Sequence, residues 1–389
     1  MDLVLDDEHR AIARTVRDFV TRELIPLEPE LLRRERAGER QLTRDELADL
    51  RERARRSGLW GVGTPPEYGG AGLDPVAQAL VRIELCRTFV PFTFGGSADN
   101  ILFAATGDQI DTYLRPTLSG ERVSCFALTE PGAGSDLSGL RTTARRVDGG
   151  WVIDGEKTFI SRGADADFAM VFAVTGPRTS TSSGVTCFLV DRDRGWTSTP
   201  IPMMSSWEAA TLRFDGVRVG DEHVLGEVGR GFELAMRWIG QGRWLVPCRA
   251  IGAAQRLLGM AVEYANTRTT WGAPLADRQA IQWMIADSAV ELESVRMLTL
   301  RAAWLAGTGA DTRYASAIAK LSGAAMANAV VDRVLQIHGG MGYTRELPIE
   351  RWYRELRVLR IFEGTDEIQR RTIARGVLRG DLDVDPVGW

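Results

Sequence analysis

The sequence predicts an α+β protein in which a helical region, an antiparallel β region and a second helical region follow one another. Apolar residues recur at helical spacing before residue 120 and after residue 230. Between these regions, short β-branched and aromatic runs are separated by turn residues. A chain of 389 residues also exceeds what one hydrophobic core usually serves. We therefore expect three domains, over residues 1–120, 121–230 and 231–389.

The N-terminal region is predicted to form helices that are interrupted by proline and glycine. Its charged stretch from Arg33 to Arg56 alternates in sign, which indicates a solvated helix face rather than a nucleic-acid-binding patch. The helices that we expect are Glu8 to Leu24, Thr43 to Ser57 and Asp74 to Arg87.

The middle region carries strand patterns, with turns such as Asp148-Gly149-Gly150 between them. The alternation of short apolar runs and turns is typical of an antiparallel sheet. The strands that we expect are Val123 to Leu128, Thr142 to Val147, Trp151 to Ile153, Phe168 to Val174, Val185 to Val190 and Ala210 to Phe214.

The C-terminal region returns to long helical patterns, and its last part contains a notable turn. A glycine-rich turn at 339–342 precedes an amphipathic run that breaks at Phe362-Glu363-Gly364. Thr365 then has the character of a helix N-cap, with Asp366 and Glu367 in the first turn. Glu363 should therefore lie in a short turn between two helices. The long helices that we expect are Val246 to Asn266, Gln279 to Gly307 and Tyr314 to His338.

The local sequence pattern allows two interpretations of the role of Glu363. A carboxylate backed by the apolar pair Ile361-Phe362 has its charged form disfavoured, which would raise its pKa toward the range of a general base. The alternative is an ordinary glutamate in a surface turn. The local pattern alone leaves both readings open.

Composition narrows the class of protein. The formal charge of −4 is too near neutral for a nucleic-acid binder, and no apolar run is long enough to span a membrane. Four separated cysteines and three isolated histidines predict neither disulfides nor a metal site. The acidic N-terminus lacks a signal-sequence pattern, so we expect a cytoplasmic protein.

Six motifs follow one another along the chain: Leu128 to Asp136, Gly155 to Gly163, Arg268 to Gln279, Gln336 to Gly342, Arg354 to Arg357, and Glu363-Gly364-Thr365 with Ile368-Gln369. Taken together and in order, they resemble the acyl-CoA dehydrogenase family over almost the whole chain. Alone, the Thr-Glu-Pro-Gly turn could be an ordinary β-turn, Phe159 a core aromatic, and Arg268 a solvated helix-end arginine. The resemblance implies a barrel-like middle domain and a C-terminal four-helix bundle.

The resemblance implies FAD as the cofactor, held between subunits. The Gly-x-Gly-x-x-Gly fingerprint of a dinucleotide-binding Rossmann fold is absent from this sequence. Residues implied to line the flavin are Phe126, Leu128, Thr129, Phe159 and Ser161. Residues implied to bind its pyrophosphate and adenosine are Arg268, Trp271 and Gln279, which with Gln336 and Gly340 would reach the cofactor of a neighbouring subunit. Thr365 and Glu367 are further cofactor candidates. The implied assembly is a homotetramer, a dimer of dimers.

The resemblance also implies the reaction, an α,β-dehydrogenation of an acyl-CoA thioester to the trans-2-enoyl-CoA. Glu363 would abstract the α-proton, flavin N5 would accept the β-hydride, and an electron-transfer flavoprotein would accept the electrons. Ser135 would touch the pantetheine chain, and Arg243, Phe362 and Gly364 would contact substrate. In one branch of the family the base lies just before this arginine, where this chain has Gly242.

Some positions depart from the usual family pattern. Gly240 stands where an acidic residue often contacts the CoA chain, and Met203 to Trp207, His338 and Trp244 also differ. We expect His338 to be a packed ring rather than a proton donor. These departures leave the acyl chain and its carrier open, so an acyl group bound to a carrier protein remains an alternative. Two further alternatives are a flavin oxidase or monooxygenase on the same scaffold, and a non-enzymatic helical assembly protein.

Overall fold

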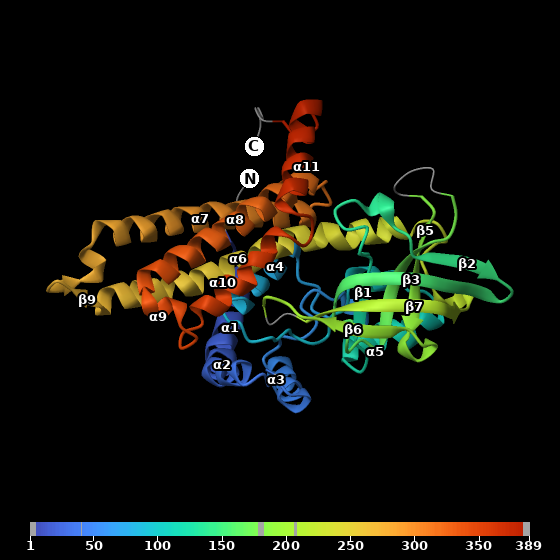
Figure 1. Cartoon of the computed structure of the whole chain (residues 1–389), viewed down its shortest axis with the longest axis horizontal. Coiled ribbons are helices and arrows are strands. Elements are labelled where there is room, and N and C mark those ends of the chain that lie inside the picture. Colours follow the sequence, from blue (N-terminus) through green and yellow to red (C-terminus); the bar gives the residue numbers. More distant parts are fainter. Residues whose placement is uncertain (1–4, 40, 178–182, 206–207, 384–389) are drawn as a thin grey trace. The chain divides into compact units, whose positions relative to one another are not determined.

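The computed structural model describes residues 5–39, 41–177, 183–205 and 208–383. The chain divides into two compact units (Figure 1). The helical unit comprises Met1–Gly63, Gly72–Phe94 and Gly240–Trp389, and the β unit comprises Thr64–Ala71 and Gly95–Ile239. Ser206 and Trp207, part of one departure from the family pattern, lie outside the described residues.

Three of the N-terminal helices of the helical unit, α1, α3 and α4, begin at capping residues that the sequence supplies. The Asp6 carboxylate accepts from His9 N at 2.7 Å, Thr43 and Glu46 form a capping box, and Asp74 accepts from the first turn of the fourth helix. The expected helices are confirmed, although the first continues into a π-helical turn over Val20–Leu24. The helices are α1 (Asp7–Phe19), α2 (Glu28–Arg36), α3 (Arg44–Arg56) and α4 (Pro75–Leu85).

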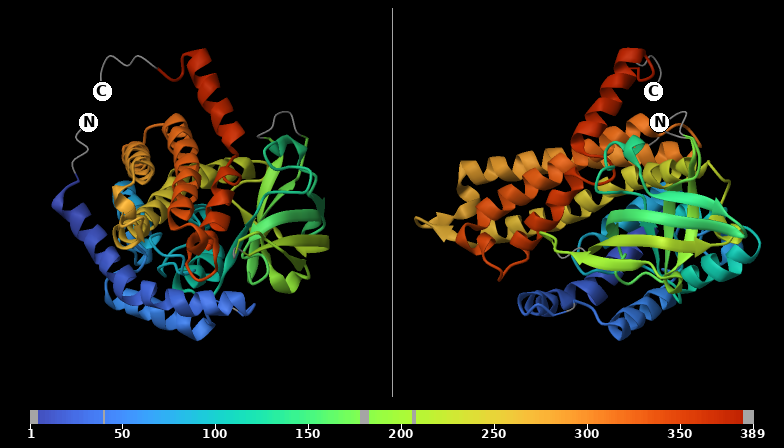
Figure 2. Two further views of the ribbon diagram at one scale, coloured as in Figure 1. Left: turned by 60° about the vertical axis from the view of Figure 1, so that its left-hand side comes forward. Right: turned by 45° about the vertical axis from the view of Figure 1, so that its right-hand side comes forward.

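The C-terminal helices pack around α8 (Arg313–His338), which contacts α7 (Gln279–Gly307), α10 (Ile349–Arg357) and α11 (Asp366–Arg379). Figure 2 shows α7 and α8 running side by side. Alanine and glycine fill much of the buried face of α8, which lets neighbouring helices approach closely.

Two predictions in this region need correction. Helix α6 begins at Gly231 rather than Val246 and runs to Thr267 with Pro247 inside it. The glycine run after α8 is not only a turn, because α9 (Gly340–Tyr343) forms one helical turn within it. Close packing explains the small residues of α6: a Cβ at Gly252 would lie 2.2 Å from the Ile83 carbonyl oxygen of α4. A short hairpin, β9 (Thr269–Thr270) with β10 (Ala273–Pro274), joins α6 to α7.

The β unit contains an eight-stranded sheet in the order β6-β7-β3-β2-β4-β5-β8, with β1 also paired to β4. Most pairs are antiparallel as predicted, but β1 and the start of β2 lie parallel to β4. For β2, the reason is that the chain reaches β4 through the β2–β3 hairpin. The strands are β1 (Ser124–Ala127), β2 (Thr143–Val147), β3 (Gly150–Ser161), β4 (Phe168–Val174), β5 (Val185–Asp191), β6 (Thr197–Ile201), β7 (Ala209–Val219) and β8 (Val224–Leu225).

Strand β4 separates the two cores of this unit. Its residues alternate between faces, so Phe168 and Phe172 enter one core while Ala169 and Val171 enter the other. The first core includes Leu114 from the short helical segments that precede β1. Because both faces are covered, β4 reads as a continuous apolar run in the sequence.

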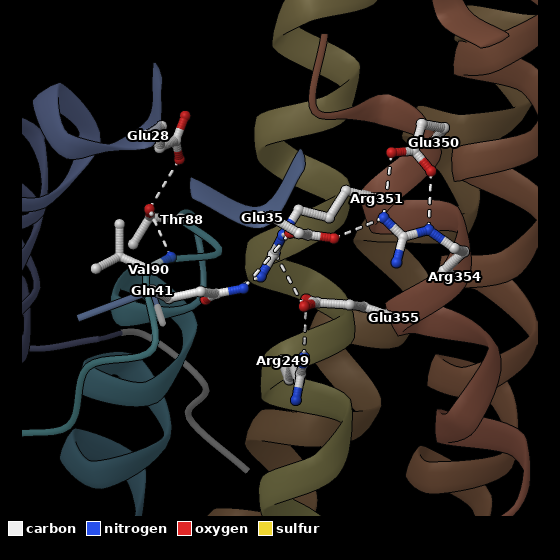
Figure 3. Close-up of polar contacts among 10 residues, drawn as sticks. All are labelled: Glu28, Glu35, Gln41, Thr88, Val90, Arg249, Glu350, Arg351, Arg354 and Glu355. Atoms are coloured by element: carbon white, nitrogen blue, oxygen red, sulfur yellow. Dashed lines mark hydrogen bonds and ion pairs between the residues drawn. The ribbon is translucent and has the colours of Figure 1, made fainter. Parts of the chain in front are cut away.

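A network of ion pairs ties α10 to two other helices of the helical unit (Figure 3). Glu35 of α2 accepts from Arg351 Nε at 2.6 Å and from Arg354 at 2.8 Å. Glu355 lies 2.9 Å from Arg351 and 3.2 Å from Arg249 of α6. Arg351 and Glu355 are almost fully buried, so each charge depends on its partners for the solvation that water no longer provides. The network fixes α10, and α10 leads directly into the turn that carries Glu363.

We expect Arg351→Met to lower the free energy of unfolding by about 3–5 kcal/mol, because it leaves the buried Glu355 carboxylate without one of its two cationic partners. Urea unfolding followed by circular dichroism measures this. The matched control is Arg56→Met, which removes an exposed pair with Glu52 and should leave the unfolding midpoint unchanged. Equal midpoints for the two variants would contradict a supporting role for the network.

Candidate active site

Glu363 lies in a turn between the 3₁₀ segment Val358–Arg360 and α11, as the sequence predicted. Its backbone has φ 56°, and Gly364 follows with φ 88°. A left-handed conformation at a glutamate is uncommon and costs on the order of 1–3 kcal/mol. Thr365 is the N-cap of α11, and its hydroxyl accepts from Ile368 N at 3.3 Å. The turn therefore stores strain at the residue predicted to be the base.

The Glu363 side chain rests against α6 at Gly242. A Cβ placed on Gly242 would lie 2.9 Å from Cδ and from Oε2 of Glu363, closer than real Cβ contacts allow. From the sequence alone, Gly242 indicated only that this position cannot supply the catalytic base. The structure adds that its missing side chain makes room for the half-buried carboxylate of Glu363.

Three side chains from three helices bind the carbonyl groups of this turn. Gln369 Nε2 of α11 donates to Glu363 O at 3.0 Å and to Gly364 O at 3.1 Å. Lys320 Nζ of α8 donates to Gly364 O at 2.7 Å, and Arg243 Nε of α6 makes a longer contact of 3.5 Å with Glu363 O. Burial lowers the pKa of Arg243, while the nearby Glu363 carboxylate opposes that shift.

Lys320 and Gln369 carried no predicted role. Gln369 belongs to a quoted motif, so its presence was visible but its function was not. Lys320 lies at a core position of the helical period, among the buried Ala317, Ala319 and Gly323. A lysine at such a position is the signal that would have pointed to it, because lysine is almost never fully buried without a partner.

The other predicted residues near the turn have different surroundings. Phe362 is half-buried and packs against the helical core, and Gly364 is half-buried. Glu367 is exposed, and backbone and Thr365 hydrogen bonds at the start of α11 lower its pKa. The neighbouring Asp366 is buried and accepts from Arg360 Nε at 2.6 Å.

In the β unit, the first two predicted flavin motifs are joined by hydrogen bonds. Thr158 N donates to Thr129 O at 2.8 Å, and Lys157 Nζ donates to Leu128 O at 3.0 Å. Lys157 also lies 2.8 Å from Glu130 Oε1 and is fully buried. Burial lowers the pKa of Lys157 to about 8, and Glu130 opposes that shift. The structure thus brings together two segments that the sequence places roughly thirty residues apart.

Among the predicted flavin-lining residues of the β unit, Phe159 has an unusual backbone conformation and an unusual exposure. The pairing of β3 with β7 shifts register between Lys157 and Ile160, so Thr158 and Phe159 form a bulge. Phe159 has φ 58°, and its ring is 61% exposed. Ser161 is also exposed at the end of β3. A strained backbone that holds a large apolar ring in solvent fits a site for a flat ligand.

The remaining predicted site residues of the β unit lie in β1 or in the loop that follows it. Phe126 is half-buried, and its ring stacks on Trp238 with centroids 4.1 Å apart and an interplanar angle of 8°. Trp238 Nε1 donates to Asp99 at 3.0 Å, and sequence reasoning did not identify it. Leu128 is buried, whereas Ser135 is exposed in the loop after β1. One face of the Phe126 ring is therefore already covered by protein.

A third group of predicted residues surrounds the β9–β10 hairpin in the helical unit. Arg268, Trp271 and Gln279 are exposed, and Trp271 is 93% exposed with φ 45°. Tyr264 of α6 stacks on His338 of α8, with ring centroids 4.4 Å apart. This stack brings the segment before Arg268 beside the segment that carries the exposed Gln336 and Gly340. Figure 1 shows this hairpin and α11 at different ends of the helical unit, so Thr365 and Glu367 form a separate group.

His338 is a packed ring, as expected. Its Nδ1 lies 2.8 Å from Val334 O, and burial lowers its pKa. Within the described part of the chain, no group of three or more His, Cys, Asp or Glu side chains is arranged to hold a metal ion. In the same residues, no helix is long and apolar enough to cross a membrane. All four cysteines are buried free thiols.

We expect Phe159→Gly to change the free energy of unfolding by less than about 1 kcal/mol, because glycine tolerates the left-handed backbone and the exposed ring contributes little burial. Flavin affinity, measured by fluorescence titration, should fall. The control is Phe172→Ala in the core, which should cost about 3–5 kcal/mol. A large loss of stability in Phe159→Gly would show that the ring serves the fold rather than a ligand.

Comparisons with known proteins agree along the whole chain. Three family models match in order: "Acyl-CoA dehydrogenase, N-terminal domain" at residues 6–121, the middle domain at 125–217 and the C-terminal domain at 229–378. The (R)-benzylsuccinyl-CoA dehydrogenase of Thauera aromatica is 38% identical, with 99% of each chain covered. The mitochondrial short-chain specific acyl-CoA dehydrogenase of Mus musculus is 36% identical, over 96% of this chain and 91% of that one. The structure of butyryl-CoA dehydrogenase from Megasphaera elsdenii aligns with a TM-score of 0.86 at 30% identity, over 97% and 100% of the two chains.

Proposed function

This chain belongs to the acyl-CoA dehydrogenase family, and from that premise we propose that it converts an acyl-CoA thioester to the trans-2-enoyl-CoA. The observation that carries the proposal is the Glu363 turn. A strained carboxylate-bearing turn is held by side chains from three helices, and α6 leaves a glycine-sized space for the carboxylate. Such preorganisation suits a group that must meet a weakly acidic C–H bond.

The chain's own groups account for the proton-transfer half of the reaction. Glu363 takes the proton from Cα of the acyl group, and the negative charge that develops passes to the thioester oxygen. By the resemblance, the backbone N–H of Glu363 is one donor to that oxygen. Gly364 has no side chain to obstruct approach to the turn, and Arg243 and Phe362 beside it are the proposed substrate contacts.

FAD is the cofactor that we propose, and two features of the β unit fit it. The exposed Phe159 ring offers an apolar face, and Thr129 and Ser161 offer hydroxyl groups close to it in the paired motifs. When bound, FAD supplies an acceptor for the hydride from Cβ, which no amino-acid side chain can provide. Leu128 and Phe126 complete the proposed flavin-lining set, and Ser135 is proposed to meet the pantetheine chain.

We expect Glu363→Gln to fold and to retain FAD but to lose the bleaching of flavin absorbance on addition of substrate. The reason is that an amide has no basic site for the α-proton. The measurement is anaerobic titration with a panel of acyl-CoA esters, which also identifies the preferred acyl chain. The control, Glu346→Gln, removes an exposed carboxylate away from the turn and should bleach normally. Normal bleaching by Glu363→Gln would remove Glu363 as the base.

We also propose that the chain assembles as a homotetramer, a dimer of dimers. Four large apolar residues of α7 are exposed at seven-residue intervals, which places them along one face of the helix: Trp283, Val290, Met297 and Trp304. The exposed, strained Trp271 adds to the apolar surface at the end of α7. A partner chain that covers this face would remove it from water.

The proposed assembly would also account for the two groups in which the predicted cofactor residues of the helical unit lie. The hairpin group, which comprises Arg268, Trp271, Gln279, Gln336 and Gly340, is proposed to hold the pyrophosphate and adenosine of a neighbouring copy's FAD. The second group, Thr365 and Glu367 beside Glu363, is proposed to contact the cofactor of its own copy. The separation of the hairpin from α11 supports this division.

We expect the double variant Trp283→Glu/Met297→Glu to shift the native mass from that of a tetramer to a dimer or monomer, because two buried charges would oppose association. Light scattering after size-exclusion chromatography measures the mass, and the flavin spectrum reports cofactor retention. The control is Val228→Glu, which adds a charge at an exposed position of the β unit. A wild-type protein that is monomeric yet fully loaded with FAD would contradict the proposed assembly.

For the electron acceptor, we propose an electron-transfer flavoprotein, since a reduced enzyme must be reoxidised to turn over. Stoichiometric peroxide release in air would instead support an oxidase on the same scaffold. We propose CoA as the carrier of the acyl group. Turnover of an acyl group on a carrier protein, but not on CoA, would overturn this proposal. We also propose a cytoplasmic location.

A further inference from the structure

Lys320 of α8 is a buried charge that the proposed reaction has not yet used. Its side chain has no exposed surface, and its neighbours on the buried face of α8 are alanine and glycine. Burying an ammonium group is costly unless it is paired or hydrogen-bonded. Burial lowers the pKa of Lys320 to about 8, so the group is still mainly protonated at pH 7. The position of its nitrogen therefore identifies what this buried charge stabilises.

The shortest contact of Lys320 is with the turn that carries Glu363. Nζ lies 2.7 Å from Gly364 O, whereas the carboxylate of Asp366 is 3.8 Å away and already accepts from Arg360. The fully buried Lys157 provides a comparison, because its nitrogen lies 2.8 Å from its partner carboxylate. Lys320 thus directs its best hydrogen bond to a backbone carbonyl of the turn rather than to its carboxylate neighbour.

This hydrogen bond acts on a strained piece of backbone. Glu363 has a positive φ, which a glutamate keeps only where the surroundings enforce it, whereas the positive φ of Gly364 costs little. Lys320 of α8 donates a hydrogen bond to the carbonyl oxygen of Gly364. Gln369 of α11 donates to the carbonyl oxygens of both Glu363 and Gly364. Loss of the ammonium group would free Gly364 O on one side and let the turn relax away from Gly242.

The charges around Lys320 come from each element that packs on it. Glu363 in the turn and Asp366 and Glu367 of α11 favour its protonated form, and Arg243 of α6 opposes it. The attraction is mutual, so the ammonium group favours the ionised form of the Glu363 carboxylate. A general base must be ionised before it can accept a proton.

We propose that Lys320 is a positioning residue for the dehydrogenation: it fixes the Gly364 carbonyl so that the Glu363 carboxylate stays beside Gly242. This inference rests on the proposed function of Glu363 as the base. It assigns to α8 a role in the reaction that is separate from its role in helix packing.

The test compares Lys320→Met with Lys320→Gln. Methionine removes both the charge and the donor, whereas glutamine keeps a donor, one bond shorter than that of lysine, without the charge. Asp366 keeps Arg360 as its partner in both variants, so we expect both to fold. Each variant is purified with FAD, its flavin content and melting temperature are recorded, and kcat and KM are measured against pH with the acyl-CoA ester that wild type uses best.

We expect Lys320→Met to lower kcat on the order of 10-fold to 100-fold with little change in KM, because the base is misplaced after substrate has bound. The acid limb of its kcat/KM profile should move to higher pH, since the cation that favours ionised Glu363 is gone. Lys320→Gln should share the shift of the acid limb but recover a large part of kcat. A merely structural lysine would change the melting temperature without moving the acid limb.

Wild-type kcat and an unshifted acid limb in either folded, flavin-loaded variant would overturn the inference. If Lys320→Met does not fold, Lys320→Gln alone decides the question through its acid limb. Glu363→Gln separates the two levels of the proposal. Full activity in that variant would overturn the proposed base itself, whereas an inactive Glu363→Gln beside fully active Lys320 variants would overturn only the role of Lys320.

Discussion

The predicted base of the helical unit depends on a strained turn that side chains of the surrounding helices hold in place. Glu363 and Gly364 adopt left-handed backbone conformations, and their two carbonyl groups are bound by Lys320 and Gln369. Each partner comes from a different helix, and α6 adds the space at Gly242. The position of one carboxylate is thus set by the packing of α6, α8 and α11 together, and packed helices hold a group more firmly than a loop can.

The two units use the same device at their predicted sites. In the β unit, the fully buried Lys157 donates to Leu128 O; in the helical unit, the fully buried Lys320 donates to Gly364 O. Burial lowers the pKa of each to about 8. A buried ammonium group makes a strong, charge-assisted hydrogen bond, which suits a loop that must keep one conformation. Farther from the turn, the ion pairs of the buried Arg351 with Glu35 of α2 and of the buried Glu355 with Arg249 of α6 anchor α10 in a similar way.

Sequence reasoning succeeded where one periodic signal extended over a whole element. The bounds of α7 and β4 match the predictions, because their patterns are regular and end at clear signals. The prediction of elements failed where the sequence pattern did not clearly indicate one type of secondary structure. The exposed strand β6 lacks an apolar run, and the expected start of α6 at Val246 missed the helical turns before Pro247, a residue through which the helix continues. The parallel pairing of β1 with β4 is a matter of topology, which strand patterns do not encode.

The sequence by itself determined the helix–sheet–helix order, the family, the turn at Glu363 and the N-cap at Thr365. These follow from local periodicity, capping chemistry and ordered motifs, all of which are properties of neighbouring residues. Only the tertiary structure decided that Gly242 seats the carboxylate, that Lys320 and Gln369 bind the turn, and that Trp238 covers Phe126. These contacts join residues far apart in the chain, and the distances between such residues are fixed by how helices and strands pack.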